Sequence, residues 1–278
     1  MAAQPEMCVI VLSHGGGRPT AAAIESLLAQ QEELEIVLSH SGGGDTPGLI
    51  GERFRGVGVV TVPELRSPGA ARNAGLAATA APYVAFLADD CTALPGWAAG
   101  RLRRHRAGAA AVASAMAAPS RIPELAAHLL QHAYRMPHVA ASGRLRFGVS
   151  YTREVLERHG PFPEDLRGEE DVVLNGRLID AGVPIEWAPD VVIAHRYASS
   201  ARELLADQHR RGRLRYQVRG AGRPRPVLAA RALLDGPAGL RHAARRGSGV
   251  PARRLALTAP LVLAGSLATA AGIATARG

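Results

Sequence analysis

The stretch from Leu65 to Trp97 constrains the fold most, because it passes from a turn into a short helix, a strand and an acidic pair. A Ser-Pro-Gly turn leads into a run of good helix formers from residue 70 to residue 78. Pro82 blocks further helix, and the apolar run Tyr83 to Leu87 has the length of a strand buried on both faces of a parallel sheet. This stretch therefore predicts a βα-type unit with polar side chains at the strand end.

The acidic pair is Asp89 and Asp90, directly after that strand. Two adjacent carboxylates at the carboxyl end of a buried strand repel each other unless a cation neutralises them, and this edge is where open α/β sheets bind ligands. Mg²⁺ or Mn²⁺ takes one or two protein carboxylates and fills its other positions with water and phosphate oxygens. The pair predicts such a metal site; the alternative is a cap or a solvated turn.

Strand-length apolar runs alternate with a helical pattern along the first part of the chain. Residues 7–12, 35–38 and 57–62 read as strands, and Thr20 to Gln31 has apolar residues at helical spacing. The first strand is followed by SHGGGR, a glycine-rich turn that predicts either backbone contact with a nucleotide or a flexible connection. The alternation favours a doubly wound, mostly parallel sheet.

Composition limits the class of protein and of partner. The chain has 278 residues, long enough for one core of about 200 to 230 residues and an appendage, and 47% of its residues are hydrophobic. Its net charge of +9 is carried by arginine, since it contains no lysine, and favours anionic partners. Cys8 and Cys91 have no metal-type spacing and read as reduced core residues, which fits a cytosolic compartment.

Two further helices carry basic or histidine side chains. The first, from Ala98 to Ala107, holds four arginines that we expect on a solvated face. The second, from Ile122 to Arg135, places His128 and His132 four residues apart on one face, which predicts helix-surface or acceptor-cleft histidines rather than metal ligands.

The second informative region runs from Phe147 to Tyr197 and ends in an apolar strand before His195. It contains the acidic pair Glu170-Asp171 at the start of a predicted helix. Carboxylates at a helix start can cap it and interact favourably with its dipole, so a capping role is the alternative to a chemical one.

Several sequence motifs in these two regions resemble those of the family 2 glycosyltransferases, the inverting nucleotide-sugar enzymes with the GT-A fold. PGAARNAGLAA, YVAFLADDC and PGW carry the resemblance in the first half, and FGVSYTREVLERHGPFPEDLRGEED carries it in the second. It covers roughly residues 7 to 197 and implies an α/β fold, a GT-A type Rossmann-like, mostly parallel sheet flanked by helices, here with a C-terminal helical extension. It also implies transfer of a sugar from a nucleotide-diphosphate sugar to an acceptor hydroxyl with inversion.

The resemblance assigns roles to particular residues. Asp171 matches the family's general base, with Glu170 or Glu169 helping to orient acceptor or base. Asp90 matches the last acidic residue of the metal motif, and His195 matches a histidine that reaches the metal or diphosphate in some relatives. The implied cofactor is Mg²⁺ or Mn²⁺. The residues implied to bind the donor are Ser13, Asp45, Arg72, Asn73 and Asp89.

Three positions depart from the family pattern. Ala88 stands at the first acidic position of the metal motif, and His40 and Ser41 stand where the second strand usually ends in an acidic pair. These departures keep open a different class of function, a non-catalytic GT-A-like protein that binds a sugar nucleotide or a partner.

The sequence motifs and composition predict a division of the chain into four parts. Residues 1–108 form the nucleotide-sugar half, 109–200 the acceptor-binding and catalytic half, 201–254 a basic helical extension and 255–276 an apolar helix. The last segment is free of charge for 22 residues, long enough as a helix to span about 33 Å, with most nearby arginines before it. It predicts either a membrane anchor, with the catalytic domain on the cytoplasmic side, or a soluble or interfacial helix.

The expected partners follow from these features. They are a nucleotide-diphosphate sugar donor, an acceptor that is a saccharide, a lipid-linked molecule or another small molecule, and a membrane surface. Such an activity would serve cell-envelope or glycoconjugate biosynthesis. A nucleic-acid partner is not expected, because the basic region from Arg202 to Arg231 holds a single aromatic residue and no recognised nucleic-acid motif.

Overall fold

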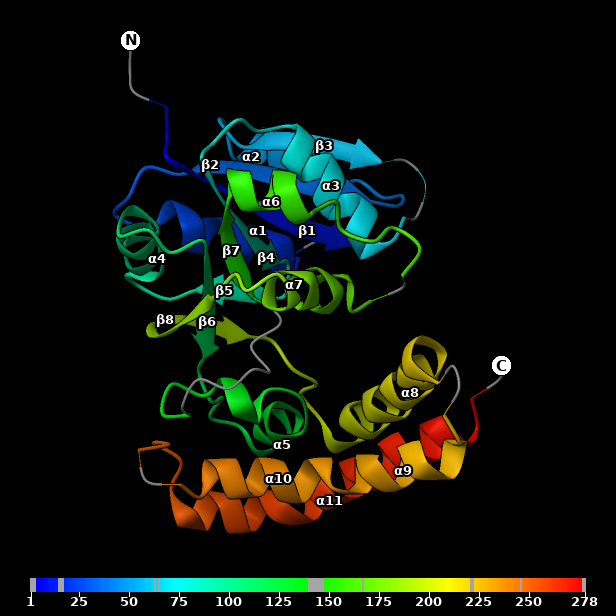
Figure 1. Ribbon diagram of the computed structural model, residues 1–278. Helices are drawn as coiled ribbons and strands as arrows, with labels where there is room; N and C mark the ends of the chain where they lie inside the picture. Colours follow the sequence, from blue (N-terminus) through cyan, green and yellow to red (C-terminus); the bar gives the residue numbers. More distant parts are fainter. Residues whose placement is uncertain are drawn as a thin grey trace. The chain divides into compact units, whose positions relative to one another are not determined.

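A computed structural model describes residues 4–14, 18–62, 64, 66–139, 148–166, 168–220, 223–245 and 247–276 (Figure 1). The chain divides into two compact units. The first comprises Met1–Ala115 and Ala141–Ala194, and the second Met116–Ala140 and His195–Gly278. The predicted division by function remains a prediction. The glycine turn at residues 15–17 lies outside the described residues.

The first unit is built on an eight-stranded sheet in the order β3-β2-β1-β4-β7-β6-β8-β5. The pairs β1–β2, β2–β3 and β1–β4 are parallel, whereas β7 pairs antiparallel with both β4 and β6. The strands are β1 (Met7–His14), β2 (Glu35–Ser41), β3 (Gly58–Val62), β4 (Tyr83–Ala88), β5 (Cys91–Ala93), β6 (Ala111–Met116), β7 (Val149–Thr152) and β8 (Ile185–His195).

Helices flank this sheet (Figure 1). Central strands β1 and β4 are almost wholly buried, which explains their unbroken apolar sequences. Their carboxyl ends meet at one edge, so β1 and β4 bring residues 12–14 and 88–90 close together. The helices of this unit are α1 (Arg18–Leu28), α2 (Thr46–Arg53), α3 (Pro68–Ala77), α4 (Trp97–Arg106), α6 (Arg153–His159) and α7 (Glu170–Asp180).

The α4 arginines are not all on a solvated face, in contrast to the prediction. Arg101 is 1% exposed, and its guanidinium lies 4.4 Å from the Trp97 ring centroid. It donates hydrogen bonds to the carbonyl oxygens of Val112 at 2.9 Å and Gly148 at 3.0 Å. The buried Arg101 guanidinium is stabilised because it donates hydrogen bonds to these backbone carbonyl oxygens.

The second unit is helical and contains the C-terminal extension expected from the sequence. Its helices are α5 (Ile122–Gln131), a short 3₁₀ turn η1 (Ala133–Arg135), α8 (Ala201–Arg219), α9 (Arg225–Leu233), α10 (Asp235–Ala243) and α11 (Ala252–Ala274). His128 on α5 is fully buried, not at the helix surface, and its Nδ1 lies 2.8 Å from the Tyr197 hydroxyl. Burial lowers the pKa of His128 to about 3, so this imidazole is neutral.

Within the described residues, α11 is the one helix long and apolar enough to cross a membrane. Length and composition alone are weak evidence, because a core helix passes the same test. Seven of its residues are buried at helical spacing: Thr258, Val262, Gly265, Ser266, Thr269, Gly272 and Ile273.

His105 at the end of α4 makes folding of the first unit depend on pH. Its ring is buried, stacks on Tyr83 and contacts Ala109 O at 2.7 Å and Ser150 Oγ at 2.8 Å. Burial lowers the pKa of His105 to about 4, whereas the unfolded chain has the ordinary value near 6.5. The unfolded state therefore binds the proton first as the pH falls.

Burial of neutral His105 contributes to the free energy of unfolding. We expect this contribution to be complete above pH 6.5 and to be lost progressively between about pH 6.5 and 4, by roughly 3 kcal/mol in all. Denaturant unfolding of the wild type and of His105→Gln at several pH values measures it. The variant should be less stable at pH 7 but should lose less stability on acidification. Equal pH slopes for the two proteins would contradict the assignment.

Candidate functional site

Arg72 on α3 joins the two sequence motifs in space. Its Nε donates to Glu170 Oε1 at 2.8 Å, and its Nη2 lies 3.9 Å from Asp171 Oδ2. The guanidinium lies 4.9 Å from the Phe86 ring centroid and 5.4 Å from that of Phe162. Burial would lower the pKa of Arg72, but the charges of Asp171 and Glu170 outweigh it and the pKa is raised. Arg72 is therefore a fixed cation.

The two carboxylates at the start of α7 differ in their surroundings. The Glu170 side chain is 5% exposed and is bound directly to Arg72, whereas that of Asp171 is 18% exposed and lies farther from the guanidinium. Asp171 Oδ1 accepts a hydrogen bond from the Val172 amide at 2.8 Å. The less buried Asp171 is thus the better placed of the two to receive a proton from a bound molecule.

The loop before α7 is held against α3 by neighbouring contacts. Asn73 Nδ2 donates to the Phe162 carbonyl at 3.0 Å, and Asn73 Oδ1 accepts from the Phe162 amide at 3.1 Å. A Cβ added to Gly69 would lie 1.9 Å from Pro163 O, so only glycine permits this approach. The described contacts of Asn73 are structural, and its predicted donor contact remains a prediction.

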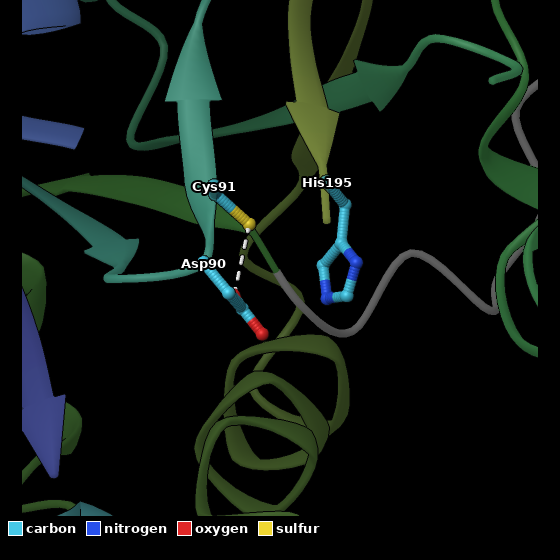
Figure 2. Close-up of side chains that lie close together, drawn as sticks. All are labelled: Asp90, Cys91 and His195. Carbon is cyan, nitrogen blue, oxygen red and sulfur yellow. Dashed lines mark hydrogen bonds between the residues drawn. The ribbon is translucent and has the colours of Figure 1, made fainter. Parts of the chain in front are cut away.

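The candidate metal ligands lie at the ends of neighbouring strands. Among the described residues, Asp90, Cys91 and His195 form a group whose potential ligand atoms all lie within 4.8 Å of one another. Figure 2 shows Asp90 and Cys91 facing the His195 imidazole, with a dashed line for the 3.5 Å hydrogen bond from Cys91 Sγ to Asp90 Oδ1. The boundary between the units falls just before His195, which is the last residue of β8.

This group fits a divalent cation. Burial and then the neighbouring charge of Asp90 raise the pKa of Asp89, while hydrogen bonds from Ser13 and the His14 backbone oppose the shift. A cation bound at Asp90 would relieve that repulsion. The carboxylate of Asp90 is a ligand type that Mg²⁺ and Mn²⁺ prefer, and Asp90 and His195 are the residues that would hold the ion. Cys91 was interpreted from the sequence only as a core residue.

The remaining predicted donor residues lie on β1, β2 and α2. Ser13 is buried, and its Oγ lies 3.3 Å from Thr20 Oγ1 and 3.3 Å from His40 Nδ1. His40 is fully buried, with Nε2 3.4 Å from Gly43 O. Asp45 is exposed at the start of α2 and makes no side-chain cap, so its carboxylate faces solvent. These positions stay predictions for donor binding.

The family model named Glycosyl transferase family 2 matches residues 8–158. The chain belongs to this family. The match confirms the expected family and with it a transferase class, and it covers both the Asp89-Asp90 pair and the strand β7.

Two curated relatives are similar over part of their length. Both are named Pre-mycofactocin glycosyltransferase, from two strains of Mycobacterium tuberculosis, and each is 28% identical over 155 residues, covering 52% of this chain. The chain spans 33% of the length of these relatives.

A solved structure resembles the whole chain. It is described as mannosyltransferase PcManGT from Pyrobaculum calidifontis in complex with GDP-Man and Mn²⁺, and it matches with a TM-score of 0.59 and 20% identity over 97% of this chain and 87% of that one. At this identity the likeness shows the fold, which confirms the expected GT-A type α/β architecture.

The buried ion pair generates a prediction about stability. Arg72→Leu should leave the Glu170 carboxylate buried without its cation and lower the free energy of unfolding by about 3 to 5 kcal/mol. The double variant Arg72→Leu/Glu170→Leu should recover much of this loss, because the buried Glu170 charge is removed together with its cation and only the less buried Asp171 loses a partner. Denaturant unfolding of the wild type, both single variants and the double variant measures the coupling. Additive losses would show that the pair is not energetically linked.

Proposed function

We propose that this chain transfers a sugar from a nucleotide-diphosphate donor to an acceptor hydroxyl with inversion, with a divalent metal at Asp90. The observation that carries the proposal is the buried Arg72, which orders Glu170 and Asp171 at the start of α7. The family's own chemistry and the Mn²⁺ and GDP-Man named for the structurally similar mannosyltransferase support the donor and metal.

Asp171 is the general base in this proposal. Its carboxylate takes the proton of the acceptor hydroxyl as the acceptor oxygen forms a bond to the anomeric carbon. The bond between that carbon and the diphosphate oxygen breaks, and the electron pair leaves with the diphosphate. Attack on the face opposite the leaving group gives inversion.

Glu170 and Arg72 position the base. Glu170 binds the Arg72 Nε, whereas Asp171 lies 3.9 Å from Nη2 of the same cation. The guanidinium also packs against the Phe86 and Phe162 rings, which helps to hold it in place beside the two carboxylates. A metal bound at Asp90 and His195 would supply positive charge for the departing diphosphate.

The competing function is a non-catalytic protein that binds a sugar nucleotide or a partner. Ala88 at the first position of the metal motif favours it, as does His40, whose two ring nitrogens already contact Ser13 and Gly43. Sugar transfer from any donor decides between the two functions.

Asp90→Ala tests the donor site. We expect it to abolish the Mn²⁺-dependent rise in thermal stability produced by nucleoside diphosphates, because the metal loses its carboxylate. A ligand at 100 times its dissociation constant adds about 2.7 kcal/mol, so the effect is measurable by thermal shift. Glu52→Ala, at an exposed residue of α2, is the control and should respond like the wild type. Unchanged metal-dependent stabilisation in Asp90→Ala would remove this residue from the metal site.

Asp171→Asn tests the base. The substitution keeps the size of the side chain but removes its ability to accept the proton, so transfer should fall by about 10² to 10⁴-fold while nucleotide affinity changes little. Asp180→Asn at the other, exposed end of α7 is the matched control. Transfer and nucleotide binding are measured on the same preparations. Near-normal transfer would exclude Asp171 as the base, and lost nucleotide binding would assign it to the donor site.

A further inference from the structure

The second unit presents an apolar surface on helices α9 and α11. Among the described residues, eleven large hydrophobic side chains are exposed; five of them belong to these two helices, and a sixth, Leu234, directly follows α9. Scattered apolar side chains are normal on a protein surface, but a concentration on adjacent helices marks an interaction surface. The six residues, together called the α9–α11 face, are Val227, Leu233, Leu234, Leu257, Leu263 and Leu267.

The exposed side of α11 is apolar along nearly its whole length. Leu257, Leu263 and Leu267 are 58%, 46% and 62% exposed, and Pro260 lies between the first two. Every residue from 255 to 276 is uncharged, so the exposed side carries no charge after Arg253 and Arg254. A surface helix of a water-soluble domain normally places charged residues there.

The opposite side of α11 is committed to packing within the unit. A Cβ at Gly212 of α8 would lie 2.1 Å from Thr269 O, and one at Gly272 of α11 would lie 2.1 Å from His209 O. The two backbones are therefore in direct contact along this crossing. Thr269 Oγ1 also donates to Gln208 Oε1 at 3.3 Å.

The packing of α11 against α8 limits how α11 can interact with a lipid bilayer. Its partner α8 carries many charged side chains, among them Asp207, whose carboxylate pairs with Arg210 and Arg211. A spanning α11 would carry α8 into hydrocarbon or lose its contacts with it, and either is costly. A helix with one packed side and one apolar, exposed side suits the plane of a membrane surface.

The net positive charge of the segment that contains α9 indicates which kind of partner surface the α9–α11 face would bind. From residue 225 to residue 254 the chain has seven arginines and a single acidic residue, Asp235, which pairs with Arg215 at 2.5 Å. Arg231 is exposed on α9, four residues after Val227 and three before Leu234, and therefore lies beside them. Such an excess of positive charge fits anionic lipid headgroups. It disfavours a second copy of the chain, since a two-fold contact would bring the same arginines together.

We propose that the α9–α11 face docks on an anionic lipid surface, with α11 in the plane of one leaflet and its leucines among the acyl chains. The 23 residues of α11 make a contact about 35 Å long. In this arrangement Arg231 lies at the level of the headgroup phosphates. This docking is independent of the sugar-transfer proposal, because none of these residues belongs to the candidate site.

Vesicle sedimentation of the full chain tests the docking. It should bind vesicles of phosphatidylglycerol and phosphatidylcholine more tightly than vesicles of phosphatidylcholine alone, and salt should weaken the binding. Leu263→Glu/Leu267→Glu should lower the partition coefficient at least tenfold. The matched control is Leu28→Glu/Leu49→Glu, at exposed leucines of the first unit, and should bind like the wild type. Arg231→Gln should lower binding to the anionic vesicles by about fivefold and leave binding to neutral vesicles unchanged.

Several outcomes would overturn the proposal. Each variant should fold, because all changed side chains are exposed, and circular dichroism checks this. Equal binding by wild type and Leu263→Glu/Leu267→Glu, or no binding of the wild type to anionic vesicles, removes the face as a lipid contact. Retention of the expressed chain in host membranes through alkaline carbonate extraction would indicate a spanning helix instead. A dimer that the leucine variant dissociates, without vesicle binding, would assign the face to a second copy.

Discussion

A buried arginine that packs against two aromatic rings determines the geometry on which the candidate site depends. Arg72 lies over Phe86 of β4 and Phe162 of the loop before α7, and binds Glu170 at the start of that helix. A buried cation of this kind is stable only because carboxylates and ring faces replace the water it has lost. The same contacts connect the central strand, α3 and α7. The position of the carboxylates relative to the strand end is thus set by one side chain that cannot lose its charge.

The sheet supplies the other half of the arrangement. Parallel pairing of β1 with β2 and β4 brings three strand ends to one edge, where Ser13, His40 and Asp89 come within reach of one another. Repulsion between Asp89 and Asp90 is tolerated there because the edge is partly open and Ser13 donates to Asp89. Sites in open α/β sheets lie at such edges for the same reason: backbone and side chains converge while the core below stays closed.

Local sequence predicted much of this architecture, because unbroken apolar strands and their glycine and proline boundaries reflect interactions close along the chain. The strands β1 and β4 and the acidic strand end follow from residues within a few positions of one another. The pairing of Arg72 with residues 98 and 99 positions later does not, since no periodicity encodes it. The burial of Arg101 was missed for the same reason: its partners are carbonyl groups of β6 and of the chain before β7, which composition does not reveal. The sequence did not predict that Cys91 lies near His195, because their proximity depends on the pairing of β5 with β8, which are far apart along the chain.

The C-terminal helix shows where an average over a segment conceals its physical character. Hydropathy treats every residue of α11 alike, and by that measure the segment is long and apolar enough to cross a membrane. The structure separates its residues into a side of small and hydroxyl residues that admits the α8 backbone and a side of leucines that faces outward. Small residues permit close helix crossing in water as they do in lipid, so their presence does not indicate a bilayer span. A membrane-spanning helix and a packed helix of a water-soluble unit differ in the helix they pack against. Because α11 packs on the charged α8, one of its sides stays in contact with the protein and only the other side is available to lipid.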